Sequence, residues 1–298
     1  MEKEKSPTKA DRSRRFRNCM HYPKMKIAQY VDLNTKKITE KSFQREIWEQ
    51  HWSESSLDDL ILQLKINPIY WNLLGKIKKK DCILEAGCGF GQWVTVLTDL
   101  GFNIKGVDIA GNTIKKIKKT FPKANVSIAD VEALPFKDES FDVYLSFGVI
   151  EHFKEGPQQV LGEAKRVLRK NGLLYLTIPY LNPFRFIRYA IFNNKKGQFY
   201  QYLYSEKETI RLIEKAGFEV ESIKHFDFIN AIRKDIPLAN LLLDKILNAN
   251  YNKLAVSDRK FNLSYRKAQD FRAKKLSLIQ KVLYKLDSYI ILVEAYKK

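Results

Sequence analysis

Hydrophobic and polar positions follow two periods along the middle of the chain. Short apolar runs of strand length are each followed by a segment whose apolar residues recur every three or four positions, as in a helix with one buried face. The runs predict strands at 82–86, 103–107, 125–129, 142–147 and 172–178, and the periodic segments predict helices at 91–100, 111–120 and 156–169. This alternation predicts an α/β fold, with a parallel sheet and helices on both faces.

The pattern continues towards the C-terminus with one more helix and two more strands. The helix is predicted at 205–216, where Ser205 and Glu208 have the spacing of a capping box. The strands are predicted at 218–227 and 288–296. Upstream of these elements, the turn-forming residues Lys170-Asn171-Gly172 are expected to end the helix at 156–169.

The turn after the first core strand carries the candidate chemistry. The strand includes the acid Glu85, and glycines follow at positions 87, 89 and 91 before a helix begins. Glycine is needed where a Cβ would block close approach of the backbone to a ligand. Acids recur at the ends of the next two strands, Asp108 and Asp130. Open α/β folds bind their ligands at this carboxyl edge of the sheet.

These residues resemble the class I S-adenosylmethionine-dependent methyltransferases. Further matching segments bring the resemblance to roughly residues 70–228 and the last strand; they are 134–144, 149–153 and 171–179. The resemblance implies a Rossmann-like, seven-stranded, mostly parallel sheet with an antiparallel last strand. It also implies S-adenosylmethionine as the cofactor. A nicotinamide-binding domain is the competing interpretation, but its G-x-G-x-x-G spacing is absent because residue 92 is Gln.

The resemblance assigns the aminoacyl end of the cofactor to the glycine turn. Gly87, Gly89 and Gly91 are expected to leave room for it beside the backbone, and Cys88 lies between them. Glu85 is expected to orient the amino group, directly or through water. The alternative role of Cys88 is that of a small, buried packing residue.

The nucleoside is assigned to the ends of the next strands. Asp108 is expected to accept hydrogen bonds from both ribose hydroxyls, with a helix cap as its alternative role. Ile109 and Val131 are expected to form the walls of the adenine slot, and Asp130 to accept a hydrogen bond from the adenine amino group. Phe147 completes the expected cofactor-binding residues, and aromatic faces tolerate a sulfonium charge.

His152 is the candidate general base, because it follows the fourth core strand and its usual pKa of ~6.5 suits proton transfer near neutrality. Glu151 is expected to orient His152 or to bind the acceptor. The alternative is that His152 begins a helix and only packs, or lines the cofactor pocket. These two residues alone make a poor site for a hard cation, so no required metal is predicted.

Three segments flank or interrupt the core of 70–228 and 287–298. Residues 1–69 are predicted to form a disordered tail and a helical cap over the cofactor cleft, or an arm packed against the sheet. The aromatic insertion at 180–204 is expected to form a lid over the substrate. The insertion at 229–286 is expected to be basic and helical.

Composition and charge limit the kinds of partner that the chain is expected to bind. The 298 residues include 53 Lys and Arg against 34 Asp and Glu, a net charge of +19 that favours anionic partners such as nucleic acid or acidic lipid. The alternative is a set of solvated lysines with no dedicated partner. Three cysteines give no even disulfide framework, and no apolar run reaches the ~20 residues of a membrane-spanning helix. A cytoplasmic protein is therefore expected.

The expected function is methyl transfer to a small or lipid- or glycan-linked acceptor, at oxygen. The resemblance is to a broad group that includes quinone-pathway and bacterial surface-sugar enzymes. The alternative is an RNA methyltransferase that uses the basic surface, including residues 258–275. Peripheral contact with a membrane and a cofactor-binding role without catalysis are also open, and the sequence predicts no oligomeric state.

Overall fold

The computed structural model describes most of the predicted core. The described residues are 26–31, 40–53, 55–192, 197–226 and 289–298. The predicted disordered tail and all of the predicted basic insertion, including residues 258–275, lie outside them.

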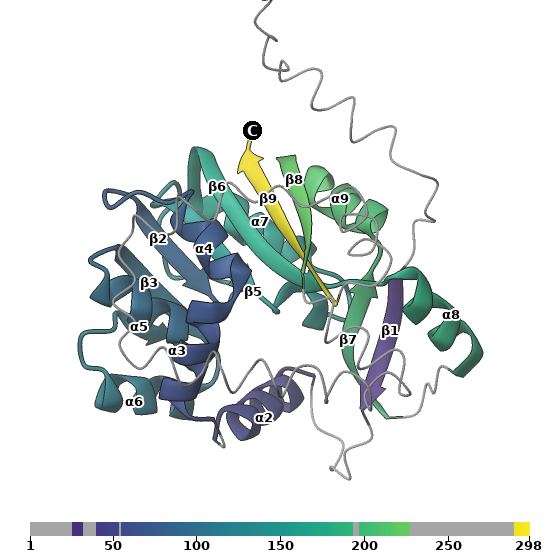
Figure 1. Ribbon diagram of the computed structural model, residues 1–298, viewed down its shortest axis with the longest axis horizontal. Helices are drawn as coiled ribbons and strands as arrows, with labels where there is room; N and C mark the ends of the chain where they lie inside the picture. The colour runs from purple at the N-terminus through teal and green to yellow at the C-terminus, as the bar shows by residue number, and fades with distance from the viewer. Residues whose placement is uncertain (1–25, 32–39, 54, 193–196, 227–288) are drawn as a thin grey trace, which may run out of the picture.

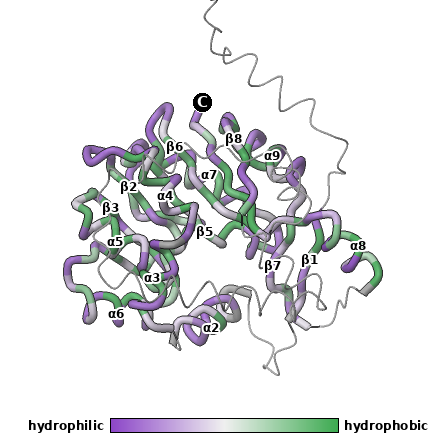
Figure 2. The backbone as a smooth tube through the Cα atoms, in the orientation of Figure 1, coloured by the Kyte–Doolittle hydropathy of each residue, from purple (hydrophilic) through white to green (hydrophobic). Residues whose placement is uncertain are grey.

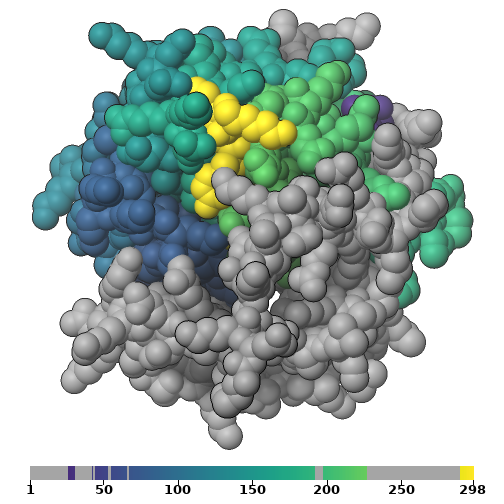
Figure 3. Space-filling model, turned by 90° about the horizontal axis from the view of Figure 1, so that it is seen from above, coloured from purple at the N-terminus to yellow at the C-terminus, as the bar shows by residue number. Residues whose placement is uncertain are grey.

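A seven-stranded sheet forms the centre of the molecule (Figure 1), in the order β4-β3-β2-β5-β6-β9-β8. The strands are β2 (Cys82–Ala86), β3 (Asn103–Asp108), β4 (Val126–Ile128), β5 (Phe141–Phe147), β6 (Leu168–Pro179), β8 (Phe218–Phe226) and β9 (Ile290–Lys297). The pairs are parallel except those of β9, which is antiparallel to both β6 and β8. From above, the yellow residues of β9 lie between teal and green neighbours (Figure 3). The predicted Rossmann-like α/β fold with an antiparallel last strand is confirmed.

Helices cover both faces of this sheet. The helices of the described residues are α2 (Glu40–Ser53), α3 (Leu57–Ile66), α4 (Pro68–Leu74), α5 (Gln92–Asp99), α6 (Gly111–Thr120), the short 3-10 helix η1 (Ile150–His152), α7 (Gln158–Val167), α8 (Pro183–Phe192) and α9 (Glu206–Lys215). One hydrophobic core lies between the sheet and α3 to α6, and the other between the sheet and α7 and α9. Consecutive strand residues face opposite cores, so Ile83 belongs to the first and Leu84 to the second. Hydrophobic colouring accordingly follows the central strands (Figure 2).

A second, two-stranded sheet was not predicted. It pairs β1 (Lys26–Val31) antiparallel with β7 (Gln198–Tyr204), and helix α8 precedes β7. The described part of the segment predicted as an aromatic lid, 180–204, therefore contains one helix and one strand. Its partner strand comes from the N-terminal segment, where the sequence pattern predicted a disordered tail and a helical cap.

The predicted end of one helix was wrong. Helix α7 ends at Val167, and Leu168 already belongs to β6, where it pairs with Phe141. The expected turn residues lie inside β6, at a shift of register before the next pair of residues, Val143 and Leu173. Asn171 there adopts a φ of 60°. The turn chemistry was recognised correctly, but it produces a bulge in a strand rather than the end of a helix.

Burial in the central strand should dominate stability. Ile83→Ala removes a fully buried side chain in β2 and is expected to lower the free energy of unfolding by about 2–5 kcal/mol. The matched change Ile128→Ala in β4, where the side chain is 55% exposed, should cost less than about 0.5 kcal/mol. Urea titration of both variants measures the difference. Equal losses of unfolding free energy in the two variants would contradict the placement of Ile83 in the core.

Candidate functional site

A bend of glycines follows β2 and is tied to the neighbouring strand β3. The N–H groups of Gly87 and Cys88 both donate to the carbonyl of Val107, at 2.8 and 2.9 Å. Gly89 has a φ of 52°, which is left-handed backbone that favours glycine. A Cβ on Gly89 would also overlap the indole of Trp52. The bend therefore requires glycine for its conformation and for the ring that packs on it.

Asp108 joins this bend to the end of β3. Its buried carboxylate accepts hydrogen bonds from the N–H of Gly89 at 2.8 Å and from the N–H of Ala110 at 2.9 Å. Ala110 precedes the first residue of α6, so Asp108 also supports the start of that helix. Burial raises the pKa of the Asp108 carboxyl, and the two N–H groups oppose the rise. One side chain thus holds two turns in fixed positions.

A cavity of about 470 Å³ opens beside these turns at the carboxyl edge of the sheet. Many of the expected site residues line it: Gly87, Gly89, Asp108, Ile109, Asp130, Val131, Phe147 and His152. The other expected residues, Glu85, Cys88, Gly91 and Glu151, are not among the residues that line it. The structure thus brings together residues from the ends of four strands.

The expected residues away from the cavity wall have other surroundings. Glu85 is 2% exposed, and burial, together with the charge of Asp108, raises the pKa of its carboxyl well above the usual value. Its Oε2 has no hydrogen-bond partner among the described residues. Cys88 is buried and packs against Gly106, which matches its alternative role. Gly91 is the N-cap residue of α5.

The far wall of the cavity comes from the loop after β4. Asp130 and Val131 line the cavity, and Oδ1 of Asp130 accepts a hydrogen bond from the N–H of Glu132 at 2.9 Å. At the opposite side, the ring of Phe147 stacks on Trp93 with centroids 4.5 Å apart. A hydrogen bond therefore holds Asp130 in one wall, and a ring contact holds Phe147 in the other.

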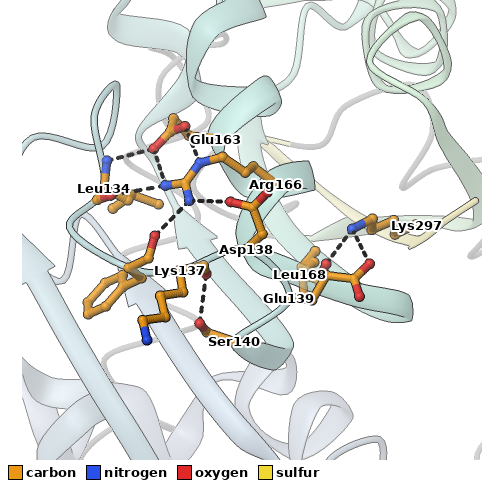
Figure 4. Close-up of polar contacts among 10 residues, drawn as sticks. Leu134, Lys137, Asp138, Glu139, Ser140, Glu163, Arg166, Leu168 and Lys297 are labelled. Atoms are coloured by element: carbon orange, nitrogen blue, oxygen red, sulfur yellow. Dashed lines mark hydrogen bonds and ion pairs between the residues drawn. The ribbon is translucent and has the colours of Figure 1, made fainter.

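Arg166 of α7 holds the loop between β4 and β5 (Figure 4). Its guanidinium donates to the carbonyls of Phe136 at 2.6 Å and Leu134 at 3.0 Å, and it forms ion pairs with Glu163 and Asp138. Glu163 in turn accepts from the N–H of Leu134 at 2.7 Å. A planar guanidinium can satisfy several acceptors at once. The clamp fixes the segment that continues from Asp130 and Val131 on the cavity wall.

His152 is held by a backbone carbonyl and two rings. Its Nδ1 lies 2.8 Å from the carbonyl oxygen of Tyr200, so Nδ1 donates and Nε2 keeps its lone pair in the neutral ring. Nε2 lies 3.9 Å from Oε1 of Glu151, beyond hydrogen-bond distance. The rings of Trp48 and Tyr200 meet the imidazole with centroids 5.0 Å apart. The ring is therefore fixed in one orientation.

Burial makes both members of the Glu151–His152 pair neutral near pH 7. It lowers the pKa of His152 to about 4 and raises the pKa of Glu151 to about 8, because the charged form of each loses water. Oε2 of Glu151 has no hydrogen-bond partner among the described residues. Near pH 7 His152 therefore has a free lone pair on Nε2, and Glu151 keeps its proton. The usual pKa of ~6.5 that the sequence analysis assumed for His152 does not hold in this structure.

Sequence reasoning did not place three side chains of α2 on the cavity wall. Gln44, Trp48 and Trp52 line it. Their spacing of four was a usable signal, because residues i and i+4 share one helix face. Residues 153–156, which follow η1, were also missed. None of the described residues in the insertion at 180–204 lines the cavity; that segment reaches the site through Tyr200, behind His152.

Two further observations concern the described residues alone. No helix among them is long and apolar enough to cross a membrane. Nor do three or more His, Cys, Asp or Glu side chains among them gather in a group that could hold a metal ion.

The buried acid Glu151 should make stability depend on pH. Between pH 4.5, the usual pKa of Glu, and about 8, the folded chain keeps a proton that the unfolded chain has lost, so stability falls as pH rises. Glu151→Gln removes this titration. Its free energy of unfolding, relative to the natural chain, should therefore increase by up to about 1.4 kcal/mol per pH unit across that window. The exposed change Glu219→Gln should show no such trend. If the free energy of unfolding changed with pH in the same way in Glu151→Gln and in the natural chain, the assignment of Glu151 as a buried, protonated acid would be refuted.

Comparisons with known proteins bear on the family of this chain. Residues 84–176 match the family described as "Methyltransferase domain". A "probable S-adenosylmethionine-dependent methyltransferase" of Mycolicibacterium smegmatis is 31% identical over 153 residues, which are 51% of this chain and 57% of that protein. An uncharacterized protein of Methanocaldococcus jannaschii is 31% identical over 170 residues, 57% of this chain and 68% of that protein. The matched region of this chain thus spans a little over half to about two thirds of these relatives.

A solved structure shows the same fold. The crystal structure of an S-adenosylmethionine-dependent methyltransferase from Methanosarcina mazei superposes with a TM-score of 0.50 at 16% identity, covering 76% of this chain and 96% of that one. The matched domain, the order of strands and the glycine bend beside an acid at the end of the next strand lead to one conclusion. This chain belongs to the class I S-adenosylmethionine-dependent methyltransferases.

Proposed function

We propose that this chain transfers a methyl group from S-adenosylmethionine to a hydroxyl group of a small or lipid- or glycan-linked acceptor. One observation carries the proposal: Gly89, Asp108 and His152, from the ends of three strands, line the same cavity. The cofactor-binding residues and the candidate base therefore share one space. Methyl transfer gains most of its rate from this kind of alignment between acceptor and methyl group.

Asp108 is suited to the ribose. Each carboxylate oxygen accepts one backbone N–H, from Gly89 or Ala110, and keeps further lone pairs. Two neighbouring hydroxyl groups can donate to these lone pairs without disturbing the turns. The existing bonds hold the carboxylate at the cavity wall, so little ordering is needed when the ribose arrives.

Glu85 is suited to the amino group of the cofactor. Its Oε2 is buried without a hydrogen-bond partner among the described residues, and its pKa is raised; both mark a site where a positive charge would be favourable. Because Glu85 does not line the cavity, we propose that it acts on the amino group indirectly, through the glycine bend or through a bridging water. The aminoacyl end is assigned to the cavity wall at Gly87 and Gly89, where the side chains of Val149 and Trp52 fill the space that a Cβ would take.

The remaining cofactor contacts are assigned to the two side walls. Ile109 and Val131 offer apolar surface to the adenine ring, and Asp130 offers an acceptor for its amino group. Phe147, held against Trp93, offers an aromatic face near a sulfonium. Cys88 and Gly91 support the bend from behind.

His152 is assigned the role of removing the proton from the acceptor's hydroxyl group. When bound, S-adenosylmethionine supplies a methyl group on a positively charged sulfur, which leaves readily. The Nε2 lone pair of His152 accepts the hydroxyl proton as the acceptor oxygen bonds to the methyl carbon. The bond between sulfur and the methyl carbon breaks at the same time, and its electrons stay on sulfur. The carbonyl of Tyr200 fixes the tautomer that this role needs. Glu151, neutral at pH 7, adds no charge that would pull the proton away.

Helix α2 is proposed as the cap over the cavity and as one wall of the acceptor site. Trp48 meets the ring of His152, and Trp52 packs between Gly89 and Phe90. Asn112 of α6 donates to Glu49 of α2 at 2.9 Å, which ties the cap to the core. An acceptor with a flat or apolar part would pack against the ring of Trp48 and present its hydroxyl to His152.

The ribose assignment predicts the effect of Asp108→Ala. Loss of the carboxylate removes both the hydroxyl acceptor and the bonds that hold the bend, so the affinity for S-adenosylhomocysteine should fall at least about tenfold. Titration calorimetry measures the affinity. Asp99→Ala, an exposed aspartate at the end of α5, is the matched control and should bind normally. Unchanged affinity in Asp108→Ala would refute the assignment.

The base assignment predicts the effect of His152→Ala. The rate of methyl transfer should fall by about 10²–10⁴-fold, while the affinity for S-adenosylhomocysteine changes little. An acceptor is first found by screening transfer of labelled methyl onto phenols, sugars and lipid-linked alcohols. In the natural enzyme, kcat/KM should not fall between pH 7 and 5, since the pKa of His152 is about 4. A fully active His152→Ala enzyme, or a product methylated at nitrogen, would contradict this role.

A further inference from the structure

Helix α8 has its apolar side chains on the outside. Phe184, Ile187 and Ile191 recur at spacings of three and four along one face, and they are 45%, 56% and 66% exposed. Such a face is normally turned towards the core. Isolated exposed apolar residues are common on proteins, but a continuous row on one helix marks an interaction surface. In Figures 1 and 2 this helix lies at the edge of the molecule, away from the large sheet.

The inner face of α8 is polar and fixed to the protein. Arg185 is only 2% exposed and donates to the carbonyls of Tyr180 at 3.0 Å and Tyr289 at 3.1 Å. Its guanidinium also lies over the ring of Tyr289. The N–H of Arg185 donates to Asn182 at 2.7 Å, which closes the first turn of the helix. These contacts hold the apolar row outward, so its exposure is a consequence of how the helix is anchored.

In the sequence, the segment that contains this helix carries charge of one sign. The sequence from position 180 to position 204 contains two arginines and two lysines and no Asp or Glu, and β1 beside it contains Lys26 and no acid. Arg188, half-buried, lies next to the apolar row on the helix. The whole chain carries a net charge of +19. An apolar row with Arg188 at its border, on a chain of strongly positive net charge, matches an anionic lipid surface, where the row enters the acyl chains and the positive charge attracts the headgroups.

We propose that the face of α8 formed by Phe184, Ile187 and Ile191 docks this chain onto an anionic bilayer. Membrane docking does not depend on the identity of the methyl acceptor. It places the molecule at a surface where lipid-linked acceptors are found. With only 10 residues, α8 lies in the plane of the interface and does not insert across it.

Sedimentation with vesicles tests this surface. The full chain should bind vesicles of mixed phosphatidylglycerol and phosphatidylcholine, and bind vesicles of phosphatidylcholine alone weakly. Ile187→Ser/Ile191→Ser should lower the partition onto the anionic vesicles by about tenfold. The matched control is Leu62→Ser, because Leu62 is 59% exposed on α3 beside the acidic residues Asp58 and Asp59. This control should bind like the natural chain.

Four results would overturn the proposal. The natural chain could fail to bind anionic vesicles, or Leu62→Ser could lose as much binding as the α8 variant. Sedimentation equilibrium could show a dimer that the α8 variant loses, which would make the face an interface between copies of this chain. A lower melting temperature in the α8 variant would show that the chain itself covers this face. Methyl transfer plays no part in these measurements, so their failure leaves the proposed function untouched.

Discussion

The bond between the Asp108 carboxylate and the N–H of Gly89 is the constraint on which the site depends. It links the bend after β2 to the end of β3, and the bond to Ala110 extends the link to α6. The bend can approach a ligand only with glycine, and glycine alone does not hold a position, since its backbone is the most flexible. Asp108 supplies the fixing contact, and Trp52 closes over the bend from α2.

Burial sets the electrostatics around this link. The carboxyls of Glu85 and Asp108 have raised pKa values because burial removes water from them, and Glu85 also lacks a partner for one oxygen among the described residues. Such a pair is costly in an empty site and favours a ligand that carries positive charge. The same effect leaves His152 unprotonated and Glu151 protonated at neutral pH. One physical cause thus sets the charge of four groups in and beside the cavity.

The sequence predicted what depends on local pattern. Strand β2, the glycine bend and the acid at 108 were found because each is encoded within a few residues. The pairing of β1 with β7 was missed because it joins distant segments and neither strand has a distinctive pattern alone. Helix α7 ended early because pairing of Leu168 with Phe141 overrode the turn signal at Asn171. The position of Trp48 over His152 depends on tertiary packing, which periodicity does not specify.

A crystal structure with S-adenosylhomocysteine bound is the most direct test of the central claim. The account predicts that the ribose hydroxyls lie within hydrogen-bond distance of Asp108, that the aminoacyl end lies over Gly87 and Gly89, and that the sulfur faces the part of the cavity lined by His152. A nucleoside seated elsewhere, or a bend that stays empty in crystals saturated with the compound, would contradict it.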